Sequence, residues 1–132
     1  MPFLNWEPRY STGSAMDAEH KTWFAILNRL HDAMSQGKGR DVQQKILTEI
    51  LAYTRTHFAH EEALLQAWNY PELPAHRQLH ITFTRKVQEL EKKMNSGLPV
   101  LSLELMDFLK DWLGNHILTH DVKYGTWKKA IG

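Results

Sequence analysis

Apolar residues recur three and four positions apart along most of this chain, which is the spacing of one face of an α-helix. Four stripes of this kind run through residues 20–34, 46–68, 76–94 and 101–117. Turn-forming residues separate them at positions 37–39, 69–74 and 95–97. The sequence shows no alternation of apolar and polar residues that would indicate a strand. The pattern predicts an all-α fold, an up-down-up-down four-helix bundle with short connections.

The two ends of the chain lack this spacing. We expect residues 1–13 to form an N-terminal arm, residues 14–120 the bundle, and residues 121–132 a C-terminal tail. No internal repeat or linker interrupts the chain, so residues 1–132 are expected to form a single domain. Three aromatic residues are expected to anchor the arm: Phe3, Trp6 and Tyr10.

Composition excludes several functional classes. The 132 residues include 16 basic and 15 acidic ones without a basic block, which argues against nucleic acid as a partner. No apolar run approaches the roughly 20 residues that cross a bilayer, and the N-terminus lacks the pattern of a secretory signal. We therefore expect a cytoplasmic protein without membrane insertion. The absence of cysteine excludes disulfides, a thiol nucleophile and cysteine-ligated metals.

Ionisable residues occupy stripe positions that should face the core. Glu61 is one, and five histidines spread over the four helices are the others: His20, His57, His76, His80 and His116. Burying such groups is costly unless they are paired or bind a metal. A single one of these histidines is more simply an ordinary core residue, but together they predict a metal centre. They exceed the three or four protein ligands of one zinc ion and fit two metals that share a carboxylate.

The segment HILTHD, residues 116–121, offers two candidates for a second ligand beside His116. His116 and His120 are four positions apart and share a helix face. Asp121 is five positions from His116 and lies about 140° round a regular helix from it. Spacing alone therefore favours His120 over Asp121 as the partner of His116.

Four segments, taken in order and spacing, resemble the hemerythrin family over nearly the whole chain: MDAEH (16–20), HFAHEE (57–62), HRQLH (76–80) and HILTHD (116–121). The resemblance implies two iron ions (Fe²⁺/Fe³⁺) with an oxo or hydroxo bridge, one of which keeps a position open for O₂. It implies the following ligands: His76, His80 and His116 on one iron, His20 and His57 on the other, and Glu61 and Asp121 bridging both.

The resemblance therefore selects Asp121 and not His120. A bridge between two irons calls for a carboxylate, and the last turn of an α-helix can loosen or tighten enough to turn an i+5 side chain inward. We expect the fourth helix to end, or to depart from regular geometry, between His116 and Asp121. The other histidines, His31 and His60, are not expected to be ligands.

Reversible O₂ binding needs a dry, apolar pocket, because water and protons promote oxidation of the iron. Six apolar side chains near the expected ligands are candidates for its lining, although ordinary core packing would also explain each of them: Trp23, Phe24, Phe58, Trp112, Leu113 and Ile117. Many members of the resembled family have a smaller aliphatic residue in place of Trp23. The larger ring would narrow the pocket.

The function implied by the resemblance is O₂ carriage, storage or delivery without catalytic turnover. We expect a monomer whose ligand is O₂ and which could supply an O₂-consuming enzyme. Other classes stay open: a di-iron oxidase or peroxidase, an O₂ or redox sensor, an iron-storage protein, or a bundle without metal. The small number of carboxylates argues against strong O₂ activation.

Overall fold

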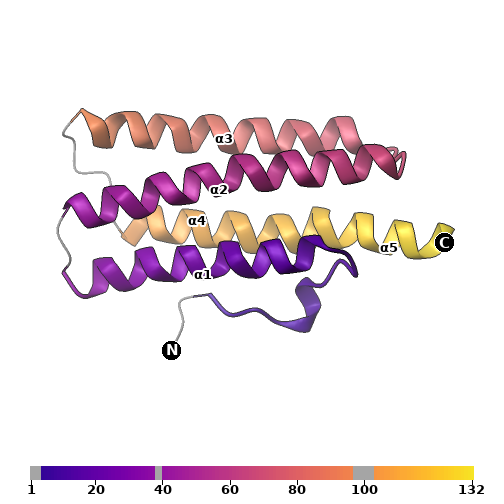
Figure 1. Cartoon of the computed structure of the whole chain (residues 1–132), viewed down its shortest axis with the longest axis horizontal. Helices are drawn as coiled ribbons and strands as arrows, with labels where there is room; N and C mark the ends of the chain where they lie inside the picture. The colour runs from indigo at the N-terminus through magenta and orange to yellow at the C-terminus, as the bar shows by residue number, and fades with distance from the viewer. Residues whose placement is uncertain (1–3, 38–39, 97–102) are drawn as a thin grey trace.

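The computed structural model describes residues 4–37, 40–96 and 103–132. Residues 4–15 form an arm with one 3₁₀ turn, η1 (Pro8–Tyr10), and the other described residues are helical apart from short connections. The main helices are α1 (Met16–Ser35), α2 (Arg40–Ala67), α3 (Leu73–Asn95), α4 (Leu103–His116) and α5 (Val122–Ile131). The first four lie side by side with their long axes aligned, and α5 continues the line of α4 (Figure 1). The predicted four-helix bundle is confirmed. Within the described ranges, no helix is long and apolar enough to cross a membrane.

A tight turn joins α2 to α3. Asn69 adopts the left-handed conformation with φ 57°. The Tyr70 amide donates to the Leu65 carbonyl at 2.9 Å, and the Asn69 amide donates to the Gln66 carbonyl at 3.0 Å. These two bonds satisfy carbonyls that the end of a helix leaves without partners. The chain therefore reverses sharply, so that the end of α2 lies beside the start of α3.

The N-terminal arm packs along α1. The Leu4 amide donates to the Asn28 side chain at 2.7 Å, and the Asn28 amide group donates back to the Leu4 carbonyl at 2.8 Å. The rings of Trp6 and Tyr10 lie 5.8 and 5.3 Å from that of Phe24. Two of the three expected anchors therefore hold the arm, and Phe3 lies outside the described residues.

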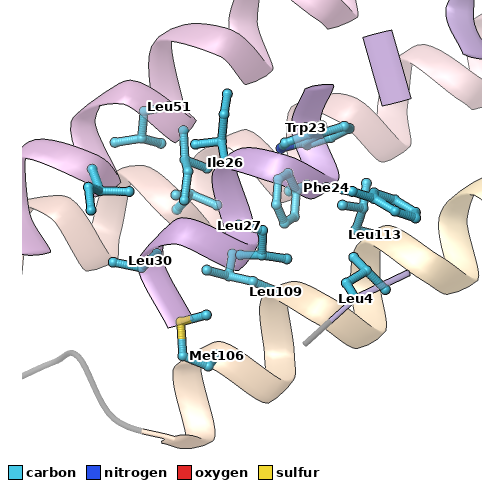
Figure 2. Close-up of a cluster of buried hydrophobic side chains, with 14 of the residues drawn as sticks. Leu4, Trp23, Phe24, Ile26, Leu27, Leu30, Leu51, Met106, Leu109 and Leu113 are labelled. Carbon is cyan, nitrogen blue, oxygen red and sulfur yellow. The ribbon is translucent and has the colours of Figure 1, made fainter. Parts of the chain in front are cut away.

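An apolar core fills the bundle towards the end of α1 and the start of α4. Leu30 and Met106 are completely buried, and Leu27, Leu51 and Leu109 are 2% exposed. Figure 2 shows these side chains facing one another from α1, α2 and α4. This core is built from the apolar stripes that define the helices, so burial of those stripes stabilises the bundle and aligns its helices.

The residues after Asp121, expected as a tail, form helix α5. The Tyr124 side chain is completely buried in a second apolar cluster with Met16, Leu65 and Tyr70. A side chain on Gly125 would collide with the backbone of Thr12, so this glycine lets the arm lie directly against α5. Helix α5 and the arm thus close the end of the bundle where α1 begins.

Candidate metal centre

One end of the bundle gathers the buried polar side chains. The helices alternate in direction, so the starts of α1 and α3 lie beside the ends of α2 and α4 (Figure 1). All seven expected ligand residues occupy these ends, and each is at most 4% exposed: His20, His57, Glu61, His76, His80, His116 and Asp121. The prediction from the apolar stripes that Glu61 and the five histidines face the core agrees with their burial.

Glu61 divides the histidines into two groups. Its Oε1 atom lies 2.7 Å from Nε2 of His76 and 3.0 Å from Nε2 of His80. Its Oε2 atom lies 3.4 Å from Nε2 of both His20 and His57. One carboxylate therefore presents a different oxygen to each group of imidazoles.

Asp121 repeats this division from the other side. Its Oδ1 atom lies 3.1 Å from Nε2 of both His76 and His116, and its Oδ2 atom lies 3.1 Å from Nε2 of His20. The site thus contains a three-histidine group, His76, His80 and His116, and a two-histidine group, His20 and His57. Both carboxylates reach both groups.

A π-helical turn, η2 (Ile117–Asp121), brings Asp121 inward. In a π-helix the hydrogen bonds run between residues five apart, so an i+5 side chain returns to the same face. The Val122 amide donates to the Ile117 carbonyl in this way. The predicted departure from regular geometry between His116 and Asp121 is confirmed. His120 is half-buried, with its ring centre 5.4 Å from that of His116.

The donor atoms fit metal ions better than they fit one another. The nearby carboxylate oxygens are not oriented to accept hydrogen bonds from most of these imidazoles, and an unsatisfied buried polar atom costs about 1–3 kcal/mol. Atoms without a hydrogen-bond partner include Nε2 of His20, His57, His80 and His116 and both carboxylate oxygens of Asp121. Cations between these lone pairs would satisfy them. Among the described residues, Glu61 with the three-histidine group and Glu61 with the two-histidine group each offer ligand atoms within 4.8 Å of one another.

Protons compensate the buried carboxylates where metal is absent. Burial opposes charging of His20 and His76, but Asp121 and Glu61 raise the pKa of each imidazole to about 9. Burial also opposes ionisation of Glu61 and Asp121, yet the surrounding imidazoles hold the pKa of both carboxyls well below the ordinary range. Metals that bind these atoms must therefore displace protons from the imidazoles.

Hydrogen bonds from outside the cluster orient its members. The Tyr124 hydroxyl donates to Glu61 Oε2 at 3.0 Å. Burial, with Glu61 and Asp121 nearby, raises the pKa of Tyr124, so the phenol stays protonated as a donor. Nδ1 of His80 lies 3.0 Å from Glu62, and Nδ1 of His57 lies 3.0 Å from Glu19. The sequence analysis did not identify Glu19, because its partner His57 is 38 residues away along the chain.

Aromatic rings pack directly against the imidazoles. Phe58 stacks on His80 with ring centres 3.7 Å apart, and Trp112 stacks on His116 at 4.4 Å. The Trp23 ring centre lies 5.2 Å from that of His57. The other pocket candidates, Phe24, Leu113 and Ile117, are at most 3% exposed, and Phe24 packs against the arm.

Known proteins resemble this chain in sequence and structure. Residues 12–127 match the family described as Hemerythrin HHE cation binding domain. A Bacteriohemerythrin from Pseudomonas aeruginosa (strain LESB58) is 36% identical over 125 residues, which are 94% of this chain and 80% of that protein. Myohemerythrin-1 from Phascolopsis gouldii is 34% identical over 110 residues, 83% of this chain and 80% of that protein. A crystal structure of wild-type hemerythrin has a TM-score of 0.89 at 31% identity and covers 94% of this chain and 96% of its own.

Proposed function

The chain belongs to the hemerythrin family, whose members bind O₂ at a di-iron site, and we propose that it binds O₂ reversibly for carriage, storage or delivery. The observation that carries the proposal is the division of the buried imidazoles by two carboxylates, each of which reaches both groups. This donor set suits two cations that share bridging carboxylates.

The three-histidine group would hold one iron and the two-histidine group the other, and both irons would share Glu61 and Asp121 as ligands. The distances from the carboxylate oxygens to Nε2 atoms of both groups support this assignment. The two-histidine group supplies one ligand fewer, so its iron would keep a position open to O₂. Two irons held there would supply reversible electron transfer to O₂.

The chain's own residues would keep this exchange reversible. Trp23 and Phe58 are 2% and 5% exposed and lie against imidazoles, so they exclude water from the site. A dry site would slow side reactions with water that leave the irons oxidised. The Tyr124 hydroxyl holds the oxygen of Glu61 that faces the two-histidine group, which keeps the proposed bridge in place.

Optical titration tests the proposal. Protein loaded with iron and reduced without air should develop a visible absorption band on exposure to O₂, and the band should disappear under vacuum over repeated cycles. Metal analysis should give two irons per chain. Irreversible oxidation with consumption of an added substrate would identify an oxidase or peroxidase instead. Iron content far above two per chain would identify a storage protein.

A paired substitution tests the ligand assignment. Asp121→Ala removes one proposed bridge and should lower the iron content below two per chain. Asp107→Ala, which changes an exposed aspartate of α4, is the matched control and should retain both irons. Wild-type iron content in Asp121→Ala would overturn the role assigned to this carboxylate.

A further inference from the structure

We propose that Glu19 is a positioning residue on which the two-histidine group depends, and that losing it releases one metal selectively. Glu19 belongs to α1 and His57 to α2, and the Glu19 Oε1 atom lies 3.0 Å from Nδ1 of His57. An ionised carboxylate can only accept hydrogen bonds, so Nδ1 of His57 carries the proton. In the metal-binding form of the ring, with the proton on Nδ1, the lone pair lies on Nε2, which faces the centre.

Glu19 is itself fixed in place by α2. The Tyr53 hydroxyl donates to the Glu19 backbone carbonyl at 3.0 Å. The exposed His60 ring approaches the second carboxylate oxygen, with Nδ1 3.2 Å from Oε2. The Tyr53 ring also lies parallel to the His57 ring, at 2° and 6.4 Å between centres. Glu19 therefore reaches His57 as part of a fixed contact between α1 and α2.

The three-histidine group has a similar outer carboxylate but depends on it less. Glu62 accepts a hydrogen bond from Nδ1 of His80 at 3.0 Å, and its other oxygen accepts from Arg77 at 2.8 Å. The His80 ring is also stacked on Phe58. Two further imidazoles, His76 and His116, remain if His80 is disturbed.

The two-histidine group would keep only one imidazole if His57 were disturbed. Its second member, His20, has no hydrogen-bond partner at Nδ1 among the described residues. His57 is therefore the one imidazole of the pair that an outer carboxylate orients. Since losing an outer-shell partner typically weakens metal affinity by about 10–100-fold, losing Glu19 should weaken the metal at this group and spare the other.

Anaerobic Fe²⁺ titration against a competing chelator tests the inference, which rests on the proposed di-iron function. Wild type should bind two ions tightly. Glu19→Ala should keep one tight ion and bind the second about 10–100-fold more weakly. Glu19→Gln keeps a neutral acceptor and should fall between the two. Glu62→Ala should lose less affinity than Glu19→Ala.

Two control variants isolate the role of Glu19. Glu49→Ala removes an exposed ion pair with Arg29 at 2.9 Å, also between α1 and α2, and should bind both ions like wild type. His60→Ala removes the outer contact of Glu19 and should also retain both ions. Wild-type affinity for both ions in Glu19→Ala would overturn the inference, and so would equal weakening of both.

Nuclear magnetic resonance of the metal-free protein separates this inference from the proposed function. The Nδ1 proton of His57 should be observed and slow to exchange with water in wild type, and should exchange rapidly in Glu19→Ala. Rapid exchange in wild type would refute the positioning role whatever the metal content. If this proton is protected but wild type binds fewer than two ions, the di-iron function fails while the positioning role stands.

Discussion

The two ends of the bundle share the same helices but fill their centres with opposite chemistry. At one end Leu30, Ile50, Val87 and Met106 meet from four helices, each at most 2% exposed. At the other end the same four helices contribute buried histidines and Glu61, and η2 contributes the buried Asp121. Both ends are equally well buried, so burial alone does not distinguish the region that stabilises the fold from the region that binds metal.

Burial of side chains therefore contributes to the free energy of unfolding in opposite ways at the two ends. The apolar end gains free energy from burial itself, about 25 cal/mol for each Å² of apolar surface. The polar end loses free energy on burial unless its lone pairs are satisfied by protons or cations. We therefore expect metal to stabilise the polar end more than the apolar end, and four experiments test this expectation.

Metal removal should have the largest effect. Each of two cations that bind only the folded chain contributes about 2.7 kcal/mol at one hundred times its dissociation constant, so the pair contributes roughly 5 kcal/mol. Stripping both irons with a chelator should lower the melting temperature on the order of 20 °C. Hydrogen exchange should accelerate around His57 and stay slow around Leu30. Uniform acceleration over the whole bundle would show that the two ends are not independent.

Truncation of the apolar end should be the next largest effect. Leu30→Ala removes a completely buried side chain and should cost about 2–5 kcal/mol in urea denaturation. Iron content should stay at two per chain, because the cavity forms away from the ligands. Val42→Ala, at a position 43% exposed, is the control and should cost less than about 0.5 kcal/mol. Loss of iron in Leu30→Ala would contradict the separation of the two ends.

Removal of one hydroxyl should have an intermediate effect. Tyr124→Phe removes the hydroxyl that donates to Oε2 of Glu61, and a hydrogen bond to a charged group is worth about 1.5–3 kcal/mol. Denaturation of the metal-free protein measures this loss. Tyr70→Phe is the matched control, because the Tyr70 hydroxyl meets the exposed Glu72 at 3.3 Å and should contribute less. Equal losses in the two variants would contradict the role of Tyr124.

Substitution of His120 should have the smallest effect. The side chain is half-buried beside the site, and His120→Ala should change the free energy of unfolding by no more than about 0.5 kcal/mol. Iron content and the visible spectrum should match those of wild type. Release of iron from this variant would show that His120 is a metal ligand after all.

Regular periodicity predicted the four main helices and the burial of the site histidines, because both follow from which residues face the core. Regular periodicity gave the wrong inward-facing residue where the backbone departs from an α-helix. Spacing favoured His120, since the 3.6-residue period assumes an α-helix, and the π-helical turn at residues 117–121 moves Asp121 inward instead. Only the family resemblance selected Asp121.

Helix α5 and the contact between Glu19 and His57 could not be predicted from the apolar stripes. Helix α5 buries Tyr124 but leaves most of its residues exposed or half-buried, so it carries little apolar pattern. Glu19 occupies a partly exposed position, 25% at the side chain, where a carboxylate is ordinary. Its partner His57 is 38 residues away, and nothing local in the sequence joins them.

Anomalous diffraction at the iron absorption edge, from crystals of iron-loaded protein, would locate the metals relative to the two histidine groups. Two peaks are expected, one beside the Nε2 atoms of the three-histidine group and one beside those of the two-histidine group. Both peaks should lie next to the carboxylates of Glu61 and Asp121. A single peak, or a second iron coordinated by His120 in place of Asp121, would contradict the proposed di-iron site.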